Sequence, residues 1–122
     1  MTKLFHHLLP AAQEIAAPQD YPPASLYFLA TPIVNLADIS LRTLHVLQLA
    51  DTIACEDTRT TRNLLQQYGI TPKPLLAAHQ HNEATAAQQI IERLTQGQRV
   101  ALVSDAGTPA ISDPGAYTVQ CV

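Results

Sequence analysis

The chain has 122 residues, of which 47% are hydrophobic and 14% are charged. This length fits a single domain, and the composition allows a buried core and argues against a disordered chain. The formal net charge of -3 is unlike that of a stand-alone nucleic-acid-binding domain, which is usually basic.

Residues 1–24 differ in composition from the rest of the chain, because prolines recur there among Ala, Gln and Asp. We expect a flexible N-terminal extension over 1–24, with one helical turn near 11–16. The remainder, 25–122, is expected to form one α/β domain. No apolar run approaches the roughly 20 residues that span a membrane, and the first ten residues are unlike a signal peptide.

Strand-like and helix-like segments alternate along the domain. In chain order we expect a strand over 26–29, a helix over 39–49, a strand over 52–55, a helix over 58–68, a strand over 74–78, a helix from Asn82 to Gly97, a strand over 99–103 and the start of a helix over 114–122. Asp38 and Asn82 are the expected N-caps, and Gly69 is a natural helix end. Such alternation predicts an open, mostly parallel sheet with flanking helices, joined by right-handed βαβ units.

The two cysteines, Cys55 and Cys121, form neither a disulfide framework nor a metal-binding spacing. Cys55 lies in an apolar run and is expected to be a buried thiol. This cysteine usage suits a reducing compartment, and we expect a cytoplasmic protein.

The loop that follows the last expected strand is the most informative part of the sequence. Residues 104–115 combine carboxylates, hydroxyls, glycines and prolines. Ligands of open α/β sheets bind beyond the carboxyl ends of the strands, so this loop is expected to bind a ligand. Gly107 allows a backbone to approach a ligand closely, and Pro109 and Pro114 stiffen the path. No GxGxxG is present, so a dinucleotide fingerprint is not supported.

The letters of this loop, SDAGTPAISDPG, resemble a signature of the ribosomal RNA small subunit methyltransferase I family, a branch of the tetrapyrrole-methylase superfamily with the class III methyltransferase fold. Three more segments resemble that family in the same order: TPIVNLADI at 31–39, ACEDTR at 54–59 and HQHNE at 79–83. Val34 stands where the family has Gly, and a β-branched residue resists positive φ.

The resemblance implies an enzyme that uses S-adenosylmethionine to methylate the 2′-oxygen of a cytidine ribose in 16S rRNA of the small ribosomal subunit. It also implies a homodimer that needs no metal. Family members continue into a second α/β domain, so the chain is expected to be a fragment or a truncated product that is inactive alone. The cofactor-binding residues implied by the resemblance are Thr31, Pro32, Asn35, Asp105, Ala106, Gly107, Thr108, Ser112 and Asp113.

Four residues are candidates for the catalytic chemistry: Glu56, Asp57, Arg59 and His81. A carboxylate at a helix start favourably meets the helix dipole, which is the simpler interpretation of Asp57. A cation in the first turn opposes that dipole, so Arg59 is expected to contact a phosphate or a carboxylate. His81 is a candidate general base, and the residues around it do not complete a set of metal ligands.

Three of the motifs follow parallel strands, so their loops should open on one edge of the sheet. We therefore expect one cleft lined by Thr31, Asn35, Glu56, Arg59, Asp105 and Thr108. Three alternatives remain open. The motifs can be ordinary βα turns, the substrate can be a small tetrapyrrole-type molecule, which the acidic net charge favours, or the chain can be a non-catalytic binding domain.

Overall fold

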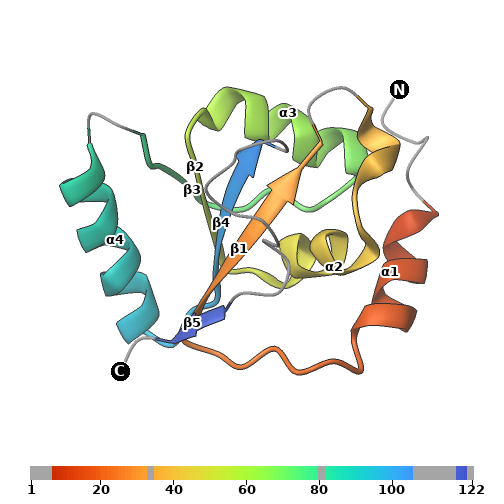
Figure 1. The fold of residues 1–122 in the computed structure, drawn as a ribbon, viewed down its shortest axis with the longest axis horizontal. Helices are drawn as coiled ribbons and strands as arrows, with labels where there is room; N and C mark the ends of the chain where they lie inside the picture. Colours follow the sequence, from red (N-terminus) through yellow and green to blue (C-terminus); the bar gives the residue numbers. More distant parts are fainter. Residues whose placement is uncertain (1–6, 33–34, 80–81, 106–117, 121–122) are drawn as a thin grey trace.

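The computed structural model describes residues 7–32, 35–79, 82–105 and 118–120. They form one five-stranded sheet in the order β3-β2-β4-β1-β5 (Figure 1). The strands are β1 (Ser25–Thr31), β2 (Thr52–Cys55), β3 (Leu75–Ala77), β4 (Val100–Asp105) and β5 (Thr118–Gln120). The pairs β1–β4, β2–β4 and β2–β3 are parallel, and β5 pairs with β1 in the antiparallel sense. The expected α/β fold with a mostly parallel sheet is confirmed.

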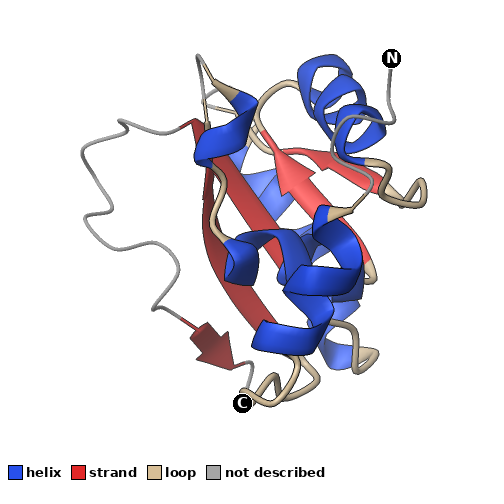
Figure 2. Ribbon diagram, turned by 90° about the vertical axis from the view of Figure 1, so that its right-hand side faces the viewer, coloured by secondary structure: helices blue, strands red, loops and turns tan. Residues whose placement is uncertain are grey.

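Helices cover both faces of this sheet, as the two orthogonal views show (Figures 1 and 2). One face packs against α1 (Leu8–Ala16), α2 (Leu41–Leu49) and α3 (Thr58–Tyr68), and the other against α4 (Glu83–Thr95). The alternation of side chains along each strand produces this division. In β1, Tyr27 and Leu29 point into the larger core, whereas Leu26 belongs to the smaller cluster with Leu94 of α4.

The elements around the second strand agree with the sequence. β2 and α3 have the expected bounds, and Gly69 ends α3 in the left-handed conformation with φ 78°. The helical spacing of α3 buries Thr61, Leu65 and Tyr68 against the sheet.

The segment before β1 departs from the expected flexible extension. Residues 8–16 form a complete helix, α1, that packs on α2 and buries Ala12 and Ala16 at 0% and 1% exposure. Two alanines four residues apart on one helical face allow this close approach. The following segment is anchored as well, because the Tyr21 hydroxyl donates to the Ala16 carbonyl oxygen at 2.9 Å.

Of the two expected N-caps, Asp38 is wrong, and Asn82 occupies the N-cap position of α4 without a side-chain hydrogen bond to the helix. Ser40 caps α2 in place of Asp38, since its hydroxyl oxygen accepts a hydrogen bond from the Thr43 N–H at 3.0 Å. Asp38 instead lies in a short 3-10 turn, η2 (Leu36–Asp38). Asn82 precedes α4, but its side chain accepts from the His79 N–H and donates to the Ala77 carbonyl oxygen, each at 2.8 Å. At Asn82, a short polar side chain thus binds nearby backbone groups outside the helix and does not cap it.

The expected helix over 114–122 is wrong at 118–120, where the structure has strand β5. Pairing with the open edge of β1 places Gln120 opposite Ser25 and Thr118 opposite Tyr27. The unpaired backbone groups of an edge strand attract another strand, and Thr and Val favour extended structure. The remaining residues of that expected helix lie outside the described part of the chain.

Candidate functional site

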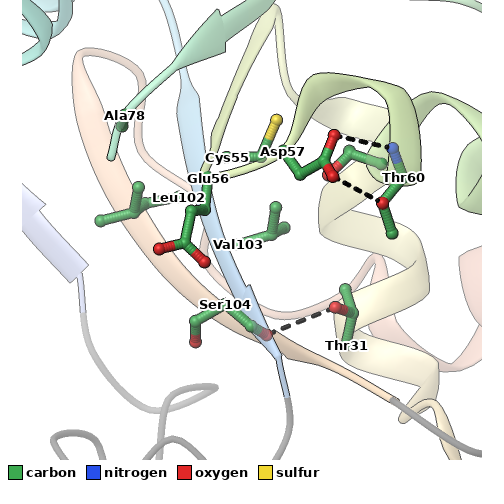
Figure 3. A pocket seen from close by; sticks show the side chains of 10 residues that line it. Thr31, Cys55, Glu56, Asp57, Thr60, Ala78, Leu102, Val103 and Ser104 are labelled. Atoms are coloured by element: carbon green, nitrogen blue, oxygen red, sulfur yellow. Dashed lines mark hydrogen bonds between the residues drawn. The ribbon is translucent and has the colours of Figure 1, made fainter. Parts of the chain in front are cut away.

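The carboxyl ends of β1, β2 and β4 lie side by side at one edge of the sheet. Thr31 of β1 is in register with Asp105 of β4, and Cys55 of β2 is in register with Val103. The loops after these neighbouring strands therefore leave from one edge, as expected for a ligand site. A cavity of about 410 Å³ opens there (Figure 3), and its lining residues are Thr31, Cys55, Glu56, Asp57, Thr60, Thr61, Ala78, Leu102, Val103 and Ser104.

Thr31 fixes the β1 side of this cavity. Its side chain is buried at 6% exposure, and its hydroxyl donates to the carbonyl oxygen of Ser104 at 3.3 Å. This bond joins the ends of β1 and β4 across the sheet (Figure 3). The hydroxyl proton is therefore already used, while the hydroxyl oxygen can still accept a hydrogen bond from a ligand.

Asp57 is committed to the start of α3. Its carboxylate accepts hydrogen bonds from the N–H groups of Arg59 and Thr60, at 3.0 Å and 3.3 Å, and from the Thr60 hydroxyl at 3.0 Å. The bonds from Thr60, joined by the one from Arg59, hold the pKa of this carboxyl below its usual value. Asp57 is thus an ionised N-cap that fixes the helix at the rim of the cavity, which agrees with the simpler interpretation of its motif.

Glu56 differs from its neighbour, although the two carboxylates are adjacent in sequence. It is exposed at the end of β2, and Figure 3 shows its carboxylate reaching over the cavity toward Ser104. Within the described part of the chain, this carboxylate has no hydrogen-bond or ion-pair partner. Glu56 is therefore the lining carboxylate that remains available to a ligand.

Cys55 and Val103 form the buried wall below these polar groups, at 1% and 7% exposure. Burial raises the pKa of the Cys55 thiol, so the sulfur stays neutral, and the expected buried thiol is confirmed. The wall is apolar where it meets the sheet and polar at the strand ends. Such a cavity suits a ligand that has both an apolar body and polar groups.

The structure brings together part of the expected cleft. Thr31, Glu56 and Asp57 line the cavity, and Asp105 ends β4 at the same edge. Asn35 and Arg59 are not among the lining residues. Asn35 is exposed and its side-chain oxygen accepts from the Ala37 N–H at 2.9 Å, so it caps η2. Pro32 follows β1 without lining the cavity, and Arg59 is exposed in the first turn of α3.

Several of the expected site residues lie outside the described residues: Val34, His81, Ala106, Gly107, Thr108, Ser112 and Asp113. Thr60, Ala78 and Leu102 also line the cavity, although no sequence motif pointed to them. Thr60 could have been found as the third residue after an N-capping Asp. Ala78 enters the wall because β3 pairs with β2, which a linear motif does not reveal.

In the described part of the chain, no set of three or more His, Cys, Asp or Glu side chains is grouped so that it could hold a metal ion. In the same part of the chain, no helix combines the length and the apolar composition needed to cross a membrane.

Comparison with known families assigns the chain to a class. The profile of the tetrapyrrole (corrin/porphyrin) methylases matches residues 25–122, and the chain belongs to this family. The match begins with β1 and covers each strand that contributes to the cavity.

Individual relatives are more specific. The chain is 55% identical over 98 residues to the ribosomal RNA small subunit methyltransferase I of Xylella fastidiosa, covering 80% of this chain and 36% of that protein. The protein of the same name from Neisseria meningitidis serogroup A is 58% identical, with 80% and 33% covered. The one from Halalkalibacterium halodurans is 50% identical, with 75% and 31% covered. The chain thus spans about a third of the length of the curated relatives it matches.

Proposed function

We propose that the chain is the N-terminal α/β domain of an S-adenosylmethionine-dependent methyltransferase. Its substrate is 16S rRNA in the small ribosomal subunit, and the acceptor is the 2′-oxygen of a cytidine ribose. The observation that carries the proposal is an identity of 50% to 58% to relatives named ribosomal RNA small subunit methyltransferase I. The cavity at the strand ends, with a free carboxylate over it, supports the same conclusion.

The described residues fit the proposed cofactor. A cavity of about 410 Å³ falls within the range of small-molecule sites. Its available polar groups include three acceptors: the Glu56 carboxylate, the Thr31 oxygen and the Ser104 hydroxyl oxygen, the last of which can also donate. The cofactor carries a sulfonium, an ammonium and ribose hydroxyls, which are cations and donors that complement these acceptors. When bound, it supplies a methyl group on a positively charged sulfur.

The residues proposed to hold the cofactor are those that the family motifs indicate: Thr31, Pro32, Asn35, Asp105, Ala106, Gly107, Thr108, Ser112 and Asp113. Among them, Thr31 lines the cavity and Asp105 ends the neighbouring strand. The buried wall of Cys55 and Val103 excludes water from the sheet side of the cavity.

Glu56 is the proposed proton acceptor for the ribose 2′-hydroxyl. A general base must reach the proton it removes, and of the two adjacent carboxylates Glu56 is the one without a partner among the described residues. Asp57 acts by positioning, because it fixes the start of α3. Arg59 is proposed to contact a substrate phosphate, and His81 is the alternative base.

We further propose that methyl transfer requires the part of the enzyme that lies beyond the matched third of the relatives. The complete enzyme is proposed to be a cytoplasmic homodimer that uses no metal. A small tetrapyrrole-type substrate is the second candidate, and two observations favour it: the description of the family and the net charge of -3.

The test is a methyl-transfer assay with radiolabelled S-adenosylmethionine on the enzyme extended to the length of its relatives. We expect label in the rRNA of undermodified small ribosomal subunits and none in tetrapyrroles. Label in tetrapyrroles alone would establish the second candidate. For the 122-residue chain we expect stable folding without turnover, and measurable turnover would show that this domain suffices. Arg59→Ala should weaken rRNA methylation and leave cofactor affinity unchanged in calorimetry.

A further inference from the structure

A second concave site lies at the other end of α3. This cavity, of about 440 Å³, is enclosed by the C-terminal half of α3 and the segment that leads into β3, and its lining residues are Arg62, Leu65, Gln66, Gly69, Ile70, Thr71, Pro72, Lys73 and Leu75. We call it the α3–β3 groove. It shares no lining residue with the cavity at the strand ends, so it is a separate site.

The groove has stiff walls and an apolar floor. Leu65 and Ile70 are buried at 3% and 4% exposure, and the Ile70 N–H donates to the Leu65 carbonyl oxygen at 3.0 Å. Pro72 and Pro74 restrict the backbone that follows. The Ile53 N–H donates to the Pro74 carbonyl oxygen at 3.0 Å, which ties this segment to β2. The groove is therefore preformed, which reduces the entropy lost on binding.

The charged side chains that line the groove are all positive. Arg62 and Lys73 line it, and no Asp or Glu is among its described lining residues. Lys73 is half-buried, and burial lowers the pKa of its ammonium, although Asp51 nearby acts in the opposite direction. An ammonium that has lost part of its hydration gains from an anion brought beside it. Arg59 lies one turn before Arg62 on α3. Positively charged side chains therefore extend along α3 from the groove toward the strand-end cavity.

An apolar floor beside two cations fits a ligand with a flat body and an attached anion. We infer that the α3–β3 groove binds one nucleotide of the RNA substrate, a neighbour of the nucleotide that is methylated. Arg62 and Lys73 hold its phosphate, and Leu65 and Ile70 contact its ribose and base. This inference rests on the proposed function. The guanidinium of Arg62 can also stack on a base, which is a frequent mode of single-strand recognition.

The spacing of the two sites suits a single RNA strand. α3 has 11 residues and joins the rim of the cavity to the wall of the groove. At 1.5 Å per residue, the two ends of the helix are about 16 Å apart. A few nucleotides of single-stranded RNA cover that distance. The groove thus gives the domain a local contact with RNA despite its net charge of -3.

The first experiment removes the cations. The probe is a fluorescent single-stranded RNA of about ten nucleotides with a central cytidine, and binding to the protein is followed by anisotropy. Arg62→Gln and Lys73→Gln should each weaken binding by about tenfold, and each should lower the salt dependence of log K by about 0.7. Arg93→Gln, on α4 across the sheet, removes the same charge and should have no effect. Lys73→Arg should retain most of the affinity.

The second experiment fills the groove without changing charge. Gln66→Trp places a large ring at a lining position, whereas Gln67→Trp places it at the next, exposed position outside the groove. We expect Gln66→Trp to weaken RNA binding and Gln67→Trp to leave it unchanged. Sedimentation of both variants reports on self-association, and inorganic phosphate is tested as a competitor.

Four outcomes would overturn the inference. If all variants bind RNA with equal affinity and rRNA methylation is intact, the groove does not bind RNA, and the proposed function is unaffected. If the unaltered enzyme does not methylate rRNA, the proposed function is wrong, and the inference that rests on it is wrong as well. Complete competition by inorganic phosphate would show an anion site that does not recognise a nucleotide. A change in the oligomeric state of Gln66→Trp alone would assign the groove to a second copy of the chain.

Discussion

The two ends of α3 face different environments, although one helix connects them. At the first end, Asp57 caps the helix at the rim of a cavity whose lining includes the Glu56 carboxylate, which has no partner among the described residues. At the other end, Gly69 reverses the chain beside a groove lined by Arg62 and Lys73. The difference shows that a helix can hold an acceptor site and a cation site at a fixed distance. One end is suited to chemistry and the other to holding a charged chain.

Glu56→Gln gives the largest expected effect at the first end. Removing the proton acceptor should lower rRNA methylation by about 10²- to 10⁴-fold, while the melting temperature stays unchanged because the side chain is exposed and unpartnered in the described residues. Glu92→Gln on α4 is the matched control, and it should retain full activity. A normal rate of the Glu56→Gln enzyme in the radiolabel assay would show that another residue is the proton acceptor, and His81 would be the next candidate.

Gly69→Ala tests the second end. Gly69 has φ 78°, where a side chain is strained, so the substitution should lower the free energy of unfolding by about 1–2 kcal/mol. Gly97→Ala is the control, because Gly97 has φ 85° and lies outside the groove. Urea denaturation should show similar losses for both variants. Unchanged stability of both variants would contradict the assigned backbone strain.

Tyr68→Phe tests how the second end is tied to the rest of the fold. The Tyr68 hydroxyl donates to the Leu36 carbonyl oxygen at 2.6 Å, so its loss should reduce the free energy of unfolding by about 1 kcal/mol.

The same substitution has a pH signature. Burial raises the pKa of Tyr68 to about 12, so the folded chain keeps a proton that the unfolded chain releases near pH 10. Stability should therefore fall as the pH rises from about 10 to 12, and the fall should be smaller in Tyr68→Phe. Burial also raises the pKa values of Tyr21 and Tyr27, so part of the fall should remain. An identical alkaline profile for both proteins would contradict the burial of this hydroxyl.

Asp57→Asn should have the smallest effect. The hydrogen bonds from Thr60 and Arg59 lower the pKa of Asp57, so the folded chain stays ionised at pH values where the unfolded chain binds a proton. This contribution is present above the unfolded pKa and is lost as the pH falls through the lowered, folded value. Asn keeps an acceptor oxygen, so stability at neutral pH should change little. Thermal melts across the acid range should show a shallower decline for the variant, and an unchanged decline would contradict the assigned cap.

Local patterns in the sequence were sufficient for the elements around α3. Helical spacing of apolar residues gave its bounds, Gly69 marked its end, and the apolar run 52–55 gave β2. The order of the motifs after successive strands also predicted a common edge, where Thr31, Glu56 and Asp105 are found. These features depend on residues close together in the chain and on the uniform geometry of parallel sheets.

The sequence did not decide between alternatives where two residues or two structures suit the same position. Asp38 and Ser40 are both good N-caps, and the choice of Ser40 follows from where the chain enters α2. The prolines of residues 1–24 indicated an extension, whereas in the fold α2 gives the α1 residues Ala12 and Ala16 a surface to pack on. Thr118–Gln120 became a strand because the edge of β1 was open to it.

By itself, the sequence determined the α/β class of this protein, the alternation of the main strands and helices from β1 to β4 and the edge at which its motifs meet, since these follow from periodicity and turn chemistry along the chain. The sequence already favoured Asp57 as a helix cap, but only the tertiary structure showed that the Glu56 carboxylate has no partner among the described residues. Asp57 and Glu56 carry the same functional group. At the start of α3, two N–H groups and a hydroxyl donate to Asp57, whereas the Glu56 carboxylate lies over the cavity. Likewise, the α3–β3 groove forms where the C-terminal half of α3 meets the segment that leads into β3, and no linear motif reveals that the two enclose a cavity.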